Sequence, residues 1–101
     1  MTFSLVARCR DTGMFGVAIS SSSPAVAARC SYTRAGAGAV ASQNITDPRL
    51  GPRVLDRMAA GLSAEHAGAA VCAEAEHITY LQILAIDGNG TTAIHSGPNS
   101  L

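Results

Sequence analysis

The sequence predicts an α+β protein with mostly antiparallel strands and two consecutive helices. Two stretches in which apolar residues alternate with polar or small ones lie at each end of the chain. In each case a glycine-containing turn joins the two stretches. Helical spacing of apolar residues is confined to the middle, over residues 52–75. Strands segregated from paired helices are typical of a sheet with helices on one face, rather than of a doubly wound parallel sheet.

The first two strands form a predicted hairpin over residues 2–21. In its first strand, "TFSLVAR", the side chains of Phe3, Leu5 and Ala7 share one side, which is the period of a half-buried strand. The turn "RDTGM" and the returning strand "FGVAISS" complete the hairpin. A third strand is predicted over "GAGAVASQN", residues 36–44, whose small side chains allow another layer or a ligand to approach the backbone closely.

Two short helices and a second hairpin follow. The first helix is predicted to begin at Pro52, a favourable first helical residue, and to stop at Gly61. Ser63 is the predicted N-cap of the second helix, over residues 64–75. The β-prone stretch "ITYLQILAI", the turn "DGNG" and the stretch "TTAIHSG" predict the last two strands.

The length of 101 residues fits one small domain. The last residues, "IHSGPNSL", run from a predicted strand to the end of the sequence. Residues 1–101 are therefore expected to be either a single domain or the N-terminal subunit of a larger one. Because an exposed strand edge requires a partner, an oligomer is expected.

The composition argues against several classes of function. Seven Arg balance seven Asp and Glu, with no Lys and no cluster of charge, so neither nucleic acid nor a membrane surface is an expected partner. The absence of Lys excludes Schiff-base chemistry by this chain. Cys9, Cys30 and Cys72 are widely spaced among apolar or small residues, which indicates buried free thiols and no metal site. With neither a signal sequence nor a run of about 18 apolar residues, a cytoplasmic protein is expected.

Polar side chains gather at the ends of two predicted strands. The run Ser20–Ser23 ends the second strand, where the hydroxyls of Ser21 and Ser22 could hold an anion or a carbonyl oxygen. A polar loop that caps its own backbone is the alternative. Gln43 and Asn44 end the third strand and could donate to an oxyanion, although a turn before "TDP" explains Asn44 equally well.

The start of the chain offers a possible nucleophile. A free N-terminal threonine carries its own base, because its α-amine can take the hydroxyl proton directly or through one water. Thr2 follows Met1, and it is either such a nucleophile after Met1 is removed or an ordinary strand residue. Arg29 and Arg34 flank "CSYT", and each could bind a carboxylate through two parallel hydrogen bonds or stay solvated.

Several short motifs follow one another along the chain: "TFS", a D-x-G turn, "PAVAAR", "RAGAGAVASQ", "GPR", "GLS" and the hairpin "QILAIDGNG". In this order they resemble the domain of unknown function 1028 family, whose members are similar to N-terminal nucleophile (Ntn) hydrolases. The resemblance runs from Thr2 to about Gly97 and corresponds to the N-terminal half of the family's usual domain. It implies that this chain forms one half of a four-layer αββα sandwich.

The resemblance also implies which residues form the site. Thr2 matches the family's proposed nucleophile and Ser21 its strand-two serine, so both are expected to be catalytic. The expected substrate-binding residues are Ser22, Arg29, Gln43 and Asn44, of which the second and third match family positions. Ser22 stands where the family typically has Lys, which removes electrostatic support for an alkoxide on Thr2.

The expected function is that of an Ntn-hydrolase-like amidohydrolase subunit that cleaves a small amide, ureido or peptide-like C–N bond. A second polypeptide from the same precursor, separated by autoproteolytic cleavage, is expected to complete it, and no cofactor is expected. The alternative is a non-catalytic domain of the same fold that binds a small molecule or serves as an assembly subunit.

Overall fold

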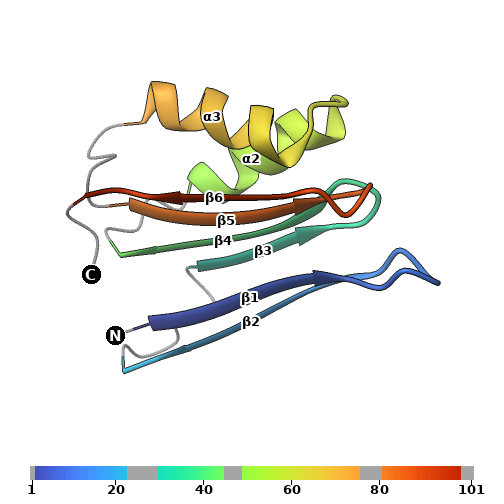
Figure 1. Ribbon diagram of the computed structural model, residues 1–101, viewed down its shortest axis with the longest axis horizontal. Helices are drawn as coiled ribbons and strands as arrows, with labels where there is room; N and C mark the ends of the chain where they lie inside the picture. The colour runs from blue at the N-terminus through green and yellow to red at the C-terminus, as the bar shows by residue number, and fades with distance from the viewer. Residues whose placement is uncertain (1, 23–29, 45–48, 76–80, 99–101) are drawn as a thin grey trace.

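The computed structural model describes residues 2–22, 30–44, 49–75 and 81–98, which form three layers (Figure 1). Two helices lie on a four-stranded sheet, and a two-stranded sheet lies against its other face. The elements in chain order are β1 (Thr2–Arg8), β2 (Phe15–Ser21), β3 (Ser31–Arg34), β4 (Gly38–Asn44), α2 (Leu50–Ala59), α3 (Ala64–Glu74), β5 (Leu81–Asp87) and β6 (Thr92–Ser96).

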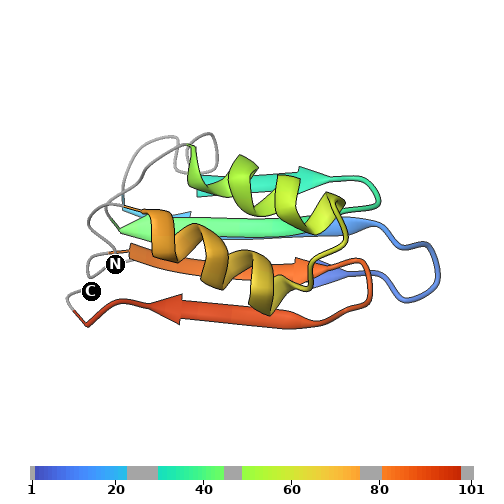
Figure 2. The same cartoon turned by 90° about the horizontal axis from the view of Figure 1, so that it is seen from above.

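Both sheets are antiparallel. β1 pairs with β2, and the larger sheet has the order β3-β4-β5-β6. Both helices cover one face of the larger sheet, with α2 packed on β3 and β4 and α3 packed on β5 and β6 (Figure 2). The prediction of an α+β fold with antiparallel strands and two consecutive helices is confirmed.

Two elements differ from the sequence-based expectation. Strand β3 was not predicted, because its four residues are too few to show alternation and its last two are exposed. Tyr32 of β3 packs against α2, where a Cβ on Gly51 would overlap the tyrosine ring. Helix α2 begins at Leu50, two residues before Pro52, which buries the Leu50 side chain. Pro52 is tolerated there because the first N–H groups of a helix have no intrahelical acceptor.

The larger core lies between the helices and the four-stranded sheet. Its fully buried side chains come from both layers, among them Val40, Val54, Val71 and Leu81. Close approach of the layers depends on Gly38, where an added Cβ would collide with the backbone carbonyl of Ile86 and the side chain of Met58. The prediction that small residues of this strand allow another layer to approach the backbone closely is therefore confirmed at Gly38.

A smaller core lies between the two sheets. Val6 of β1 meets Ala39, Ala41 and Ile86 of the larger sheet there. The opposite face of β1 carries its other set of side chains outward, and Phe3 is 67% exposed. The alternation predicted for the first strand is thus present, with its bulky side chains on the outer face.

Local signals explain how the helices begin and end. Gly61 follows α2 with φ of 105°, a backbone conformation that favours glycine. Ser63 caps α3 as predicted, its side chain accepting a hydrogen bond from the backbone N–H of His66 at 3.2 Å. Asp87, the buried last residue of β5, accepts a hydrogen bond from the N–H of Ala64 at 2.8 Å. The N-terminus of α3 is therefore tied to the β5–β6 turn.

Candidate functional site

The predicted nucleophile and the strand-two serine lie side by side at one end of the smaller sheet. Thr2 is the first residue of β1 and Ser21 the last residue of β2, and the antiparallel register places them directly opposite each other. The Thr2 hydroxyl donates a hydrogen bond to the Ser21 hydroxyl oxygen at 3.0 Å. Ser21 therefore orients the oxygen of Thr2.

The larger sheet brings a row of amide and hydroxyl groups to the same end. The register aligns Gln43 of β4 with Gln82 of β5, and Gln82 with Ser96 of β6. The Gln43 amide nitrogen donates to the Gln82 side-chain oxygen and, at 3.5 Å, to the backbone carbonyl of Thr2. The Gln82 amide nitrogen donates to the Ser96 hydroxyl at 3.3 Å. Thr2, Ser21, Gln43, Gln82 and Ser96 together are called the polar end layer below.

On β4, β5 and β6 the row of polar side chains is limited to one register layer. Residues two positions away on a strand point to the same face. On that face of the larger sheet, the next register layer has Ala41, Leu84 and Ile94 on β4, β5 and β6, with Ser31 of β3 beside Ala41. Strands β4, β5 and β6 are thus polar at this end of the inter-sheet space and apolar one register layer further in.

A pocket of about 230 Å³ adjoins the polar end layer. Its lining includes Thr2, Gln43 and Gln82 together with apolar groups such as Leu84 and Ile94. None of its lining residues has a titratable side chain. The described residues therefore present hydroxyl and amide groups to a substrate, but no side-chain base. The base that this chain could supply is the α-amine of Thr2.

Two buried polar atoms mark the end of β4. The Ser42 hydroxyl oxygen and the Gln43 side-chain oxygen have no hydrogen-bond partner among the described residues. Such an orphaned group costs about 1–3 kcal/mol of stability. Ser42, placed next to Gln43 on the strand, faces the helices, whereas Gln43 faces the space between the sheets.

The structure brings together some of the predicted site residues. Thr2, Ser21 and Gln43 meet in the polar end layer. Ser22 follows β2 and is exposed. Asn44 ends β4 opposite Leu81, with its side chain outside the described part of the structure.

Neither predicted arginine is seen at the site. Arg29 lies outside the described residues. Arg34 pairs with this chain's own Asp56, at 2.8 Å between Nη1 and Oδ1, so that guanidinium already holds a carboxylate.

Sequence analysis missed Gln82 and Ser96 as members of the layer. Gln82 carries a usable signal, because it is an isolated polar residue within the apolar run "LQILAI". Its alternation with Leu84 and Ile86 places it on the face that meets the smaller sheet. Ser96 could be assigned only once the strand register was known.

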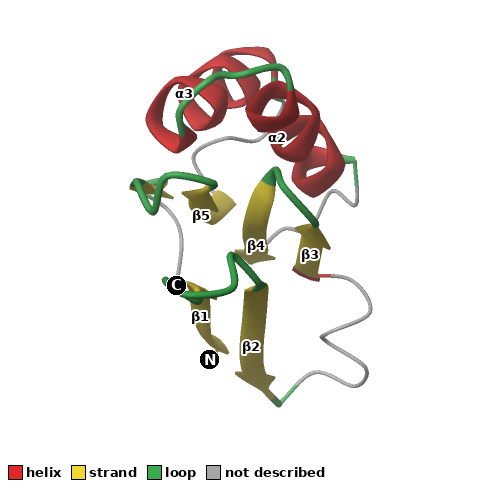
Figure 3. Cartoon of the chain, turned by 90° about the vertical axis from the view of Figure 1, so that its right-hand side faces the viewer, coloured by secondary structure: helices red, strands yellow, loops and turns green. Residues whose placement is uncertain are grey.

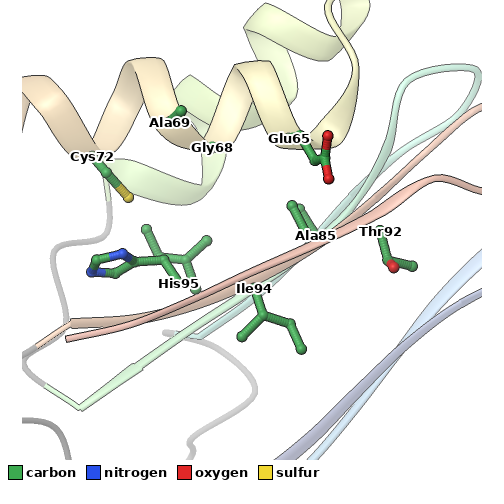
Figure 4. A pocket seen from close by; sticks show the side chains of 10 residues that line it. Glu65, Gly68, Ala69, Cys72, Ala85, Thr92, Ile94 and His95 are labelled. Carbon is green, nitrogen blue, oxygen red and sulfur yellow. The ribbon is translucent and has the colours of Figure 1, made fainter. Parts of the chain in front are cut away.

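A second pocket, of about 440 Å³, lies on the other face of the larger sheet between α3 and strands β5 and β6 (Figure 4). Glu65, Cys72 and His95 line it. Burial raises the pKa of the Cys72 thiol, which disfavours the nucleophilic thiolate. This pocket therefore contains titratable groups, but on the side of the sheet away from Thr2.

The cysteines are only partly as predicted. Cys30 is buried and Cys72 half-buried, but Cys9 is exposed. The prediction of a buried thiol is wrong for Cys9 because it begins the hairpin turn beyond the end of β1. Within residues 2–22, 30–44, 49–75 and 81–98, no group of three or more His, Cys, Asp and Glu side chains could hold a metal ion. No helix in this part of the chain is long and apolar enough to cross a membrane.

The fold and the polar end layer define an α+β protein with two packed antiparallel sheets and helices on one outer face. Residues 2–101 match the family of unknown function DUF1028, and the chain belongs to that family. Protein SPO2555 from Silicibacter pomeroyi, also assigned to DUF1028, shares 29% sequence identity with this chain, and its crystal structure superposes on this one with a TM-score of 0.93. The match covers 98% of this chain and 46% of that one, so this chain spans about half the length of its structural relative. The comparison with curated proteins finds no match.

Proposed function

We propose that this chain is a subunit of an Ntn-hydrolase-like amidohydrolase that cleaves a small amide, ureido or peptide-like C–N bond. In this proposal the three layers described here are part of a four-layer αββα sandwich, completed by a second polypeptide. Thr2 supplies the nucleophilic hydroxyl, and Ser21 orients it. Within the described residues, Gln82 donates only one of its two side-chain N–H groups, to Ser96, and supplies the other to the substrate carbonyl. Gln43 supplies a second N–H by exchanging its long hydrogen bond to the Thr2 carbonyl, at 3.5 Å, for one to the substrate.

The observation that carries the proposal is that Thr2 and Gln43, from two different sheets, line one pocket, while Ser21 of a third strand holds the Thr2 hydroxyl. Acyl transfer requires a nucleophilic hydroxyl, a base for its proton and donors for the oxyanion, and this grouping supplies the hydroxyl and the amide donors. The next register layer of β4, β5 and β6 is apolar, so the row of amide groups is specific to this end of these three strands.

The proposed reaction begins with attack of the Thr2 oxygen on the substrate carbonyl carbon, while the hydroxyl proton passes to the α-amine of Thr2. An amide N–H of the polar end layer stabilises the oxyanion that forms. The C–N bond then breaks, its nitrogen takes the proton, and the acyl group remains as an ester on Thr2. Water hydrolyses this ester and restores the hydroxyl. The α-amine is available only after Met1 is removed, so processing is part of the proposal.

A β-lactone tests the nucleophile without knowledge of the natural substrate. Attack of the Thr2 hydroxyl opens the ring and expels nothing, so the adduct adds the full mass of the lactone. We expect one adduct on Thr2 by intact-mass and fragment analysis of natively purified protein with its associated chains. The labelling rate should fall by a factor on the order of 10³ in Thr2→Ala. It should also fall in Ser21→Ala, which removes the acceptor.

Ser20→Ala is the matched control, because Ser20 is exposed on the outer face of β2. Its labelling should equal that of the unmodified chain. Full labelling of both Thr2→Ala and Ser21→Ala would show that neither residue is the nucleophile and would refute this placement of the site.

The second candidate is a non-catalytic domain that binds a small molecule or assembles with other subunits. The absence of a titratable side chain from the pocket lining favours it. N-terminal sequencing and mass measurement of every chain in the purified protein separate the two functions. Thr2 at the N-terminus, or a companion fragment that begins with Ser, Thr or Cys, supports the hydrolase. A retained Met1 with no companion supports the binding domain.

A further inference from the structure

The two sheets are unequal, and the smaller one leaves part of the larger one uncovered. β1 packs against β4 and β5, and β2 packs against β3 and β4. Strand β6 therefore extends beyond β1 on one flank of the molecule (Figure 3). Its Ile94, which is paired with the half-buried Leu84 and faces the same side, is 75% exposed.

The adjacent edge of β1 lacks the devices by which proteins block strand addition. Within the described residues β1 pairs with β2 alone, so alternate N–H and C=O groups of its other edge point away from the sheet. Charged residues and proline usually protect such an edge, but β1 contains no proline, and its only charged residue is Arg8, at the end away from Thr2. The other edge of the larger sheet, at β3, is short and ends in the ion-paired Arg34.

The pocket beside Thr2 lies at this same flank. It is lined by Phe3 and Ser4 of β1 and by Leu84 and Ile94 of the larger sheet. Paired strands lie about 4.8 Å apart, and packed sheets lie about 10 Å apart. A strand added to the edge of β1 would therefore cover β5 and β6 and direct alternate side chains toward Leu84 and Ile94.

We propose that the β1 edge together with Ile94 is the docking surface for a β-strand of the second polypeptide, with apolar residues at alternate positions. The structural relative carries about as much chain again outside the matched part, while the shared part superposes with a TM-score of 0.93. The uncharged lining of the pocket fits an apolar strand rather than a charged one. The inference rests on the part of the proposed function that gives this chain a second polypeptide, and it does not depend on the proposed hydrolysis reaction.

The added strand would form the missing wall of the pocket beside Thr2. Substrate selectivity at the proposed active site would then depend on side chains of two polypeptides. This chain would supply the polar end layer, and its partner the facing wall.

The probe is the part of the Silicibacter pomeroyi protein that lies outside the match, expressed as a separate polypeptide. We expect a 1:1 complex with this chain by sedimentation, and slowed amide hydrogen exchange in residues 2–7 on binding. Ile94→Glu places a charge under the added strand and should weaken binding at least about tenfold, as expected for a charge buried without a partner. Met14→Glu is the matched control, because Met14 is 70% exposed at the hairpin turn of β1 and β2.

The outcomes are distinct. Equal binding by Ile94→Glu and the unmodified chain, unchanged exchange in residues 2–7, or no binding of the probe would overturn the proposal. So would a homodimer of this chain that Ile94→Glu dissociates, because a second copy would then be the occupant. Strand binding without acylation of Thr2 would preserve this inference and refute the hydrolase.

Discussion

The helix-facing side of the larger sheet and the outer face of the smaller sheet differ in how completely they are covered. On one side, α2 and α3 bury the larger sheet, and side chains such as Leu50, Val54 and Leu81 are at most 1% exposed. On the other side, the outer face of β1 and β2 bears Phe3 and Leu5, which are 67% and 62% exposed. Both surfaces carry large apolar residues, but among the described residues only the first has a layer packed on it (Figure 1).

The difference shows that apolar character and burial are separate properties in this chain. A helix-covered face contributes to the stability of the folded chain, because its apolar surface is removed from water. An uncovered apolar face contributes little until a partner binds, and it is typical of an interaction surface. On the outer face of β1 and β2, the large apolar residues Phe3 and Leu5 are therefore not needed for the packing of the described fold.

The same truncation on the two sides gives the largest expected contrast. Leu50→Ala removes a side chain that is 1% exposed, and should lower the free energy of unfolding by about 2–5 kcal/mol. Leu5→Ala, at a side chain that is 62% exposed, should change it by less than about 0.5 kcal/mol. Urea unfolding followed by circular dichroism measures both. Equal losses would mean that the outer face of β1 is covered in the isolated chain.

The junction between the helical layer and the larger sheet gives the next largest effect. The carboxylate of Asp87 accepts hydrogen bonds from the N–H groups of Ala64, Asn89 and Thr91 at 2.8, 2.9 and 3.0 Å. Asp87→Ala leaves these donors without that acceptor, and should lower the free energy of unfolding by about 1–3 kcal/mol.

Asp56→Ala is the matched control for Asp87→Ala. Asp56 is an exposed aspartate whose ion pair with Arg34 lies on the surface. Such pairs contribute about 0–1 kcal/mol, so the same urea measurement should show a smaller loss. A smaller loss for Asp87→Ala than for Asp56→Ala would contradict the capping role of Asp87.

The smallest expected effect concerns the thiols. A hydrogen bond from Thr12 is the main cause that lowers the pKa of the exposed Cys9, whereas burial raises the pKa of Cys72. Because the thiolate is the reactive form, alkylation of Cys9 should accelerate at a lower pH than that of an ordinary thiol, and alkylation of Cys72 at a higher pH.

Iodoacetamide labelling with peptide mass analysis measures both pH profiles. Thr12→Val removes the hydroxyl and should move the Cys9 profile toward higher pH, while the Cys72 profile stays in place. Coincident profiles for Cys9 and Cys72 would contradict the assigned environments.

Much of the fold follows from local signals in the sequence. The first hairpin, the stop at Gly61 and the cap at Ser63 could be predicted because each depends on residues close in the chain. Strand β3 could not, because its four residues are a strand only through pairing with β4 and packing of Tyr32 on α2.

The candidate site was predictable to a similar degree. Polar strand ends pointed to Ser21 and Gln43, the position behind Met1 pointed to Thr2, and the resemblance grouped the three. Gln82 and Ser96 join the layer through pairing across β4, β5 and β6, which depends on contacts distant in sequence. The alternation in β1 likewise did not show whether Phe3 and Leu5 would face inward or outward. A period of two is the same for both orientations of a strand.

The close packing at Gly38 has a consequence for how sequences of relatives are interpreted. The nearest obstacle to a Cβ there is the backbone carbonyl of Ile86, which every residue type at position 86 would also present. A smaller side chain at position 58 would relieve only part of the overlap, so no pair of side-chain substitutions compensates for a larger residue at position 38. We therefore expect glycine to persist at this position across divergent relatives. Its invariance would record a steric limit between neighbouring strands and should not be mistaken for the signature of a phosphate-binding loop.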